Sequence, residues 1–177
     1  MRAVSVIRLI TADDAPPLAE LLRENREFLA PWNPVRPDEH FSVAGQQQLI
    51  ADLLEAHRQG LAVPQVILDG TRIAGRVTLT NIVRGAFQSG TLGYWLGEAH
   101  TGRGLATHAV AEVLRIAFDE FGMHRVEAGT LVDNVRSQRV LERNGFERFG
   151  LAPRYLNIAG RWQDHLMFQV LNPAADG

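Results

Sequence analysis

The strongest constraint on the fold is a glycine-rich junction between a strand pattern and a long helix pattern. Residues 90–96 (GTLGYWL) are typical of a β-strand, and residues 106–121 place apolar side chains at helical spacing. Gly102 and Gly104 lie between these two elements. Because glycine is a poor helix residue, two of them at a helix start indicate either a tight turn or a close approach of another molecule to the backbone.

The remaining patterns predict a mixed β-sheet with helices on its faces. Strands are expected over residues 4–9, 62–68, 72–83, 125–132, 149–158 and 165–171, with a hairpin turn at Asp69-Gly70, and helices after Thr11, from Ser42 to Gly60 and over 135–144. Three prolines make LAPWNPVRP (29–37) a fixed loop, because proline does not continue a helix. The chain has 177 residues, 46% of them hydrophobic, so we expect one α/β domain over residues 1–177.

The composition argues against several function classes. The absence of cysteine excludes a disulfide framework, a thiolate zinc site and a cysteine nucleophile. A net charge of −2 gives no basic field for nucleic acid, and the six histidines lack the H-E-x-x-H spacing, so we expect neither nucleic-acid binding nor a metal. No apolar stretch approaches the ~20 residues of a membrane span, and the first residues do not form a signal peptide, so a cytoplasmic location is expected.

The glycine junction has the physical features of an anion site. The first amides of a helix lack partners within it, the helix dipole adds positive charge there, and glycines leave room for a phosphate. Thr107, in the first turn, can add a hydroxyl contact. A P-loop needs Lys and then Ser or Thr after Gly104, where this chain has Leu105 and Ala106, and a Rossmann fingerprint needs a third glycine where it has Thr107. A turn that binds nothing is the alternative.

The sequence around the junction carries a family resemblance. With GYWLGEAH before it and DNVRSQRVLERNGFE after it, the junction resembles the pyrophosphate loop of the GNAT acyl-CoA N-acetyltransferases, (Gln/Arg)-x-x-G-x-(Gly/Ala). ENREFLAPWNPVR, NIVRGAFQSGTLGYWLG and NIAGRWQDH, in this order, are similar to the branch of ribosomal-protein-alanine N-acetyltransferases, which acetylate protein N-termini. The resemblance implies the GNAT fold, whose central strands splay to admit acetyl-CoA. Thr101 departs from the family pattern, which has Gln or Arg there.

The resemblance also implies the reaction and its cofactor contacts. Acetyl-CoA is the expected co-substrate, and a primary amine attacks its thioester directly in a ternary complex. Many GNAT enzymes protonate the leaving thiolate with a tyrosine at the position of Leu141, which this chain lacks. The branch instead implies that Asn134 holds the pantetheine arm and Ser137 hydrogen-bonds the sulfur; the alternative is that Asn134 is only an N-cap and Ser137 a first-turn helix residue. The other expected cofactor contacts are Trp95, Leu96, Arg103, Gly104, Leu105, Ala106 and Thr107.

The motifs say less about which residues bind the acceptor amine and remove its proton. Glu98 is the expected base, because it follows the strand before the cofactor loop; His100 has a suitable intrinsic pKa and is an alternative. Further alternatives are Glu27, Asp164 and His165. The expected substrate contacts are Glu27, Trp32, Tyr94 and Asp164. Competing interpretations are solvated charges, core packing of Tyr94 and Trp95, and an ion pair between Asp164 and Arg161.

Three functions stay open on these grounds. The first is acetylation of a protein N-terminus, which should need an open groove between the LAPWNP loop and the RYLNIAGRW hairpin. The second is acetylation of a small amine, such as a polyamine, an amino acid derivative or an antibiotic, which should need a closed, acidic pocket. The third is a non-catalytic acetyl-CoA-binding module. The oligomeric state is also open, with a homodimer as one alternative.

Overall fold

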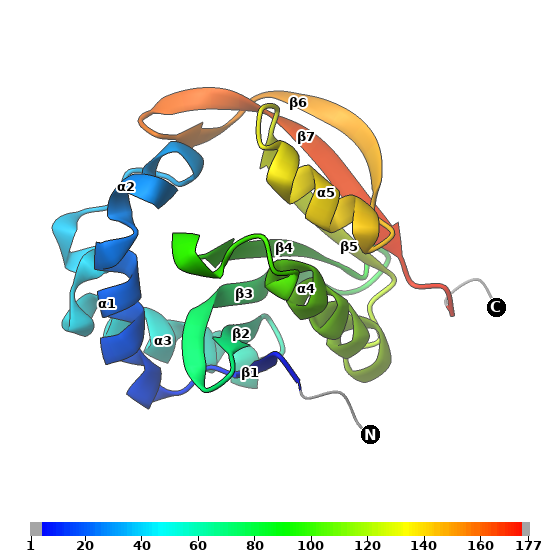
Figure 1. The fold of residues 1–177 in the computed structure, drawn as a ribbon. Coiled ribbons are helices and arrows are strands. Elements are labelled where there is room, and N and C mark those ends of the chain that lie inside the picture. Colours follow the sequence, from blue (N-terminus) through cyan, green and yellow to red (C-terminus); the bar gives the residue numbers. More distant parts are fainter. Residues whose placement is uncertain (1–4, 175–177) are drawn as a thin grey trace.

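The computed structural model describes residues 5–174, which form a seven-stranded mixed sheet with helices against both faces (Figure 1). The strands are β1 (Ile7–Leu9), β2 (Val63–Asp69), β3 (Arg72–Val83), β4 (Ser89–Leu96), β5 (Arg125–Leu131), β6 (Glu147–Ile158) and β7 (Arg161–Leu171). The helices are α1 (Ala15–Glu24), α2 (Arg26–Leu29), α3 (Val43–Arg58), α4 (Leu105–Arg115) and α5 (Val135–Arg143). No helix of this described part is long and apolar enough to cross a membrane.

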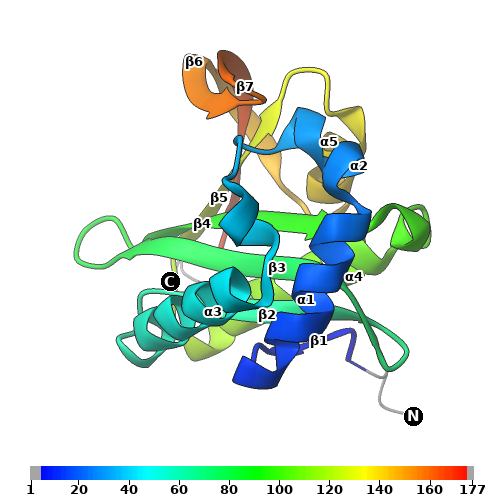
Figure 2. The same ribbon diagram turned by 90° about the vertical axis from the view of Figure 1, so that its left-hand side faces the viewer.

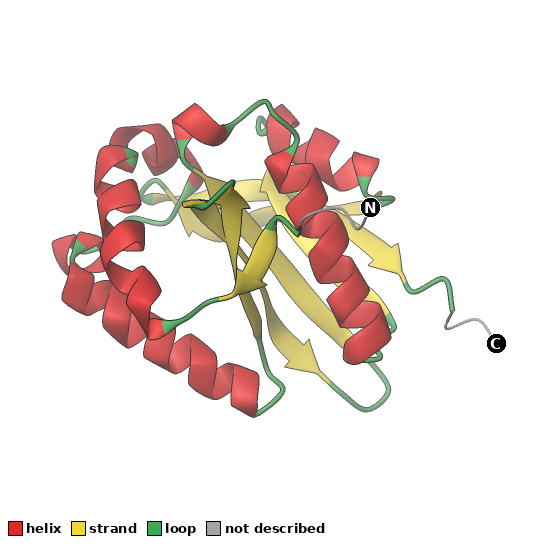
Figure 3. Ribbon diagram, turned by 60° about the horizontal axis from the view of Figure 1, so that its bottom comes forward, coloured by secondary structure: helices red, strands yellow, loops and turns green. Residues whose placement is uncertain are grey.

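The strands lie in the order β1-β2-β3-β4-β5-β7-β6, and β4 and β5 run parallel while the other neighbours run antiparallel. Helices α1 and α3 cover one face, and α4 covers the other (Figure 2, Figure 3). Leu18 and Ile50 carry the packing of α1 and α3 against Val66. On the opposite face, Val110 of α4 packs against Val77 and its neighbours. The predicted mixed sheet flanked by helices is therefore confirmed.

The parallel pair β4 and β5 separates partway along its length. The two strands pair only at Ser89–Arg125, Gly90–Val126 and Thr91–Glu127. Beyond these pairs β4 continues to Leu96 and β5 to Leu131 without hydrogen bonds between them. The facing edges therefore diverge and open a gap between the two halves of the sheet, which is the splay that the resemblance implied.

Several element boundaries differ from the predictions. The strand expected over residues 4–9 is observed as Ile7–Leu9, and residue 4 lies outside the described residues. The helix expected over 106–121 becomes a π-helix at Ile116–Glu120. A π turn rotates the following side chains relative to α-helical register, and Ala117 and Phe121 both contact the core there.

The last hairpin is longer than its sequence pattern predicts. The pattern places its strands at 149–158 and 165–171, whereas β6 begins at Glu147 and β7 at Arg161. Ala159 and Gly160 form its turn, both with positive φ. The added residues are mostly exposed and polar, so hydrophobic alternation does not mark them. The predicted C-cap of α5 is confirmed, since Gly145 has a φ of 78° and Phe146 is buried beyond it.

β3 approaches β4 closely at Gly75, so a substitution there tests how far this contact contributes to stability. A Cβ built at Gly75 would lie 2.0 Å from the backbone oxygen of Trp95, which cannot move without shifting β4. We expect Gly75→Ala to lower the free energy of unfolding by about 1–3 kcal/mol or more, as overpacking does. Urea denaturation measures this change.

Gly93 provides the matched control. It is also a strand glycine without positive φ, but nothing lies within 4 Å of its Cβ position. Gly93→Ala should therefore leave the free energy of unfolding almost unchanged. Equal destabilisation by both substitutions would show that lost backbone flexibility, rather than the clash with β4, decides the outcome.

Candidate active site

The start of α4 forms an open cradle of backbone amides. Gly102 and Gly104 have φ angles of 77° and 79°, in the left-handed region that favours glycine. Nothing lies within 4 Å of a Cβ position at Gly102, and the nearest atom to one at Gly104 is 3.8 Å away, on the His108 ring. The following amides, from Leu105 to Thr107, have no acceptor within the helix. The junction therefore presents unobstructed donors at a positive helix end.

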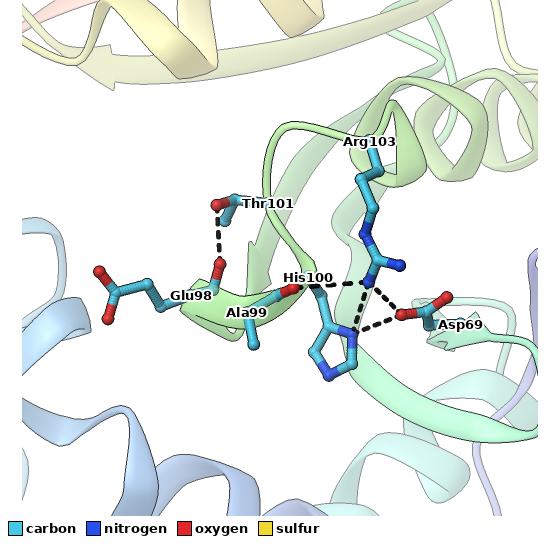
Figure 4. Close-up of polar contacts among 6 residues, drawn as sticks. All are labelled: Asp69, Glu98, Ala99, His100, Thr101 and Arg103. Carbon is cyan, nitrogen blue, oxygen red and sulfur yellow. Dashed lines mark hydrogen bonds and ion pairs between the residues drawn. The ribbon is translucent and has the colours of Figure 1, made fainter.

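An ion-pair cluster holds the loop before this cradle. Asp69, at the end of β2, pairs with the Arg103 guanidinium, and its Oδ2 lies 2.7 Å from Nδ1 of His100 (Figure 4). The hydrogen bonds from His100 and Arg103 keep the pKa of Asp69 below its usual range. The Arg103 side chain is thus directed to the β2–β3 turn. The sequence predicted Asp69 only as a turn residue, because its partners lie far along the chain.

Thr101 and Glu98 belong to the same loop but not to this cluster. The Thr101 hydroxyl donates to the backbone oxygen of Glu98 at 2.8 Å and so stabilises the 3₁₀ turn Glu98–His100. The family departure at Thr101 therefore has a local structural role. The Glu98 carboxylate is exposed and is directed away from Thr101 and Arg103 in Figure 4. The Glu98 amide donates to Oδ1 of Asn25 at 2.8 Å, which fixes the loop against the end of α1.

Tyr94 and Ser137 meet across the splay. The Tyr94 hydroxyl lies 2.7 Å from Oγ of Ser137 and donates to the Ser137 backbone oxygen at 3.1 Å. Burial raises the pKa of Tyr94 to about 12, against the opposing effect of the hydrogen bond with Ser137. Ser137 also donates its amide to Oδ1 of Asn134 at 3.2 Å, so Asn134 is the N-cap of α5. Leu141 is buried in the core and offers no acid.

The backbone of β4 presents alternate donors to its two sides. The Gly97 amide donates to Ala74 of β3 at 2.9 Å, and the Trp95 oxygen also faces β3. Because successive peptide groups of a strand point to opposite edges, the Leu96 amide faces the gap toward β5. Of the two cofactor contacts expected in β4, Leu96 is the one whose amide is directed into the splay, while the Trp95 amide contributes to the β3 ladder.

A cavity of about 590 Å³ lies on the α1 and α3 face, beside Trp95. The side chains of Tyr94 and Trp95 point to opposite faces, so the cavity is separated from Ser137 by the strand itself. The 30–36 loop lines it, and the Ala159 amide of the last hairpin donates to the Asn33 oxygen at 3.0 Å. Four of the lining residues have cationic or titratable side chains, namely Arg26, Arg36, His40 and Arg76. None of these four was predicted from the sequence as a site residue.

The structure places the other predicted acceptor residues away from this cavity. Glu27 and Trp32 are exposed and do not line it. Asp164 accepts a hydrogen bond from the Arg154 amide at 2.8 Å, and within residues 5–174 it forms no ion pair with Arg161. His165 is buried, with Nδ1 3.0 Å from the Gln163 oxygen. In the same range no three acidic or histidine side chains gather closely enough to hold a metal ion.

Comparison with known proteins places this geometry in a family. The model of the acetyltransferase (GNAT) domain matches residues 6–147. A probable N-acetyltransferase of Bacillus subtilis (strain 168), YjcK, is 37% identical over 94% of this chain and 93% of its own length. The [ribosomal protein uS5]-alanine N-acetyltransferase of Escherichia coli (strain K12) is also 37% identical, over 95% of this chain and 88% of its own length.

A solved structure supports the same placement. Mycobacterium smegmatis RimJ, solved in complex with CoA-disulfide, has a TM-score of 0.91 and 30% sequence identity, and the match covers 97% of this chain and 83% of that chain. The fold predicted from the sequence agrees with this match. The chain belongs to the GNAT acetyltransferase family.

Proposed function

We propose that this acetyltransferase transfers the acetyl group of acetyl-CoA to the α-amine of a protein N-terminus. The observation that carries the proposal is the gap between β4 and β5, which opens beyond Thr91 and Glu127. The amide cradle of α4 lies on one side of β4 and the cavity beside Trp95 on the other. A donor and an acceptor can therefore approach one reaction centre from opposite faces. The similarity to the uS5-alanine enzyme of Escherichia coli favours a protein acceptor.

The start of α4 fits the pyrophosphate of acetyl-CoA. A phosphate group needs several amide donors and no Cβ in its path, and the junction from Gly102 to Thr107 supplies both. The CoA-disulfide in the RimJ complex supports CoA as the ligand of this family of structures. When bound, acetyl-CoA supplies the activated thioester.

The residues at the splay can serve the three chemical tasks of the transfer. The acceptor nitrogen forms a bond to the acetyl carbon while the carbon–sulfur bond breaks. The Leu96 amide is placed to stabilise negative charge on the carbonyl oxygen. Ser137 Oγ lies 2.7 Å from the Tyr94 hydroxyl and accepts its hydrogen in this proposal, which leaves the Ser137 hydrogen to be donated to the leaving sulfur. An N-terminal amine has a pKa near 8. A weak base is therefore enough to remove the proton of the amine, and we assign this role to Glu98, acting directly or through water.

The same cavity disfavours a polyamine or another cationic acceptor. Its lining contains three arginines and one histidine and no carboxylate. A positively charged small amine would be repelled there. The cavity therefore lacks the acidic character that the small-amine function requires.

An acceptor panel tests the function. Short peptides with free N-terminal alanine or serine should release CoA in the presence of acetyl-CoA, and mass spectrometry should locate the acetyl group on the α-amine. Spermidine, free amino acid amides and amine-bearing antibiotics should react much more slowly. Faster turnover of any of these small amines would overturn the proposal, and no release of CoA with any amine would support a binding module instead.

Substitution of Gly104 tests the cradle. Gly104→Val places a branched side chain over the amides of α4, so the dissociation constant of CoA should rise by about tenfold or more, which corresponds to a loss of about 1.4 kcal/mol. Isothermal titration calorimetry measures this constant. The control is Gly122→Val, because Gly122 also has positive φ, with nothing within 4 Å, and lies at the far end of the helix. An unchanged constant for Gly104→Val would locate the cradle elsewhere.

Removal of the Ser137 hydroxyl tests its assigned role. Ser137→Ala should lower kcat by about tenfold to hundredfold, as loss of one preorganised donor does, with little change in acetyl-CoA affinity. Tyr94→Phe should lower kcat in the same direction, and the double variant should be no worse than Ser137→Ala, because both hydroxyls act through one hydrogen bond. Stopped-flow turnover and CoA titration separate the two quantities. Equal losses in turnover and affinity would contradict the role.

A further inference from the structure

The cavity beside Trp95 concentrates positive charge that the protein itself neutralises only in part. Three arginines and His40 line it, and none of its lining residues is acidic. The remaining walls are mostly apolar, from Leu22 and Leu29 to Val35 and Phe41. A cavity with this lining is unsuited to purely apolar ligands and to cations. It offers an apolar enclosure with a small number of strong donors, which is the usual form of a selective site for a charged group.

Arg76 is the central donor of this cavity. It lies in β3 directly opposite Trp95, on the same face of the sheet. Within residues 5–174 its guanidinium makes neither a hydrogen bond nor an ion pair. Burial, together with the smaller effect of the nearby Arg36, lowers the pKa of Arg76 to about 10. A partly desolvated guanidinium without partners is costly, since its charge and its donors are both uncompensated.

The other cationic or titratable residues of the cavity differ in whether an anionic side chain neutralises them. Arg26 pairs with Asp38 at 2.7 Å and stacks over the Phe41 ring at 4.3 Å, so it serves as a wall of the cavity. Arg36 is exposed at the rim and, like Arg76, has no anionic partner in the described part of the chain. Burial lowers the pKa of His40, and Arg36 and Arg76 lower it further. The uncompensated charge is therefore concentrated at Arg76 and Arg36.

The position of the cavity relates it to the acceptor. Trp95 borders the cavity, and the adjacent Leu96 presents its amide to the splay. Neighbouring residues of a strand are ~3.3 Å apart, and an extended acceptor segment advances by the same amount per residue. A group within the first few residues of an acceptor peptide can therefore reach the cavity while its α-amine lies at the splay.

We propose that this cavity selects protein N-termini that carry an aspartate or glutamate within the first four residues, and that Arg76 binds this carboxylate with Arg36 at the rim. The guanidinium plane matches a carboxylate in two parallel hydrogen bonds. The bound carboxylate supplies the anionic partner that Arg76 and Arg36 lack. The inference rests on the proposed protein acceptor, and it adds a specificity residue that neither touches acetyl-CoA nor takes part in proton transfer.

Matched peptides test the selection. Peptides with N-terminal alanine are prepared with glutamate or glutamine at position two, three or four and are otherwise identical. For at least one position the glutamate peptide should have a kcat/KM about tenfold higher, mostly through KM, as expected for one charge-assisted contact. Calorimetric titration of the same peptides onto the CoA-bound protein provides a readout independent of turnover and should show the same preference.

Substitution of Arg76 assigns the preference to the cavity. Arg76→Gln should bring the glutamate and glutamine peptides to equal kcat/KM, because the glutamate peptide loses its charge-assisted contact. Arg36→Gln, at the exposed rim, should reduce the preference partially. Arg72→Gln is the matched control, because Arg72 is an exposed arginine of the same strand outside the cavity, and it should keep the full preference. Thermal unfolding should confirm that each variant is folded.

The outcomes separate this inference from the proposed function. Equal acetylation of glutamate and glutamine peptides by the unaltered protein would overturn the selection and leave N-terminal acetylation intact. A preference that survives Arg76→Gln would overturn the assignment to this cavity. Preference for a small amine that carries a carboxylate, such as an amino acid derivative, over every peptide would overturn both the acceptor class and the proposed function.

Discussion

The loss of pairing between β4 and β5 is the constraint on which the site depends. A parallel pair at the centre of a sheet normally continues its hydrogen bonds along both strands, yet these two stop at Thr91 and Glu127. The sheet remains intact because β3 holds the outer edge of β4 and β7 holds the outer edge of β5. The inner edges are left with free backbone groups beyond that point. Those groups, together with Tyr94 and Ser137 above them, form the proposed reaction centre.

Successive side chains of β4 point to opposite faces of the sheet, and this alternation keeps the two proposed substrates on opposite sides of the strand. Tyr94 contacts the N-terminus of α5 on one face, and Trp95 contributes to the cavity and to the apolar cluster of α1 and α3 on the other. Leu96 presents its backbone to the gap between these faces. Three consecutive residues of β4 thus serve three different environments. A shift in the pairing of β3 with β4 by one residue would exchange all three, which explains why the tight contact at Gly75 matters to the site as well as to the sheet.

Local patterns were sufficient to predict the mixed sheet with its flanking helices and the glycine junction before α4. The helix start at Gly104, the turn at Asp69-Gly70 and the cap at Gly145 depend on backbone preferences of a few adjacent residues, and all three occur at the predicted places. The contacts between distant segments were not predictable in this way. Arg103 and Asp69 are 34 positions apart, and Tyr94 and Ser137 are 43 positions apart. Neither separation follows from periodicity, and no local signal distinguishes Arg76 from any other polar residue of a strand.

Arg103 has an anionic partner and Arg76 has none, and this difference agrees with the roles proposed for the two residues. Arg103 lies in the proposed cofactor loop but pairs with Asp69, so its charge is used to hold the loop in place, and the cradle relies on backbone amides that need no charged side chain. Arg76 is more buried than Arg103 and has no such partner in the described structure. A buried cation that stabilised the fold would be expected to have its counterion nearby, because an unpaired one is costly. The uncompensated charge is better explained by a ligand: the cost borne by the free protein becomes part of the affinity and selectivity for an anionic acceptor.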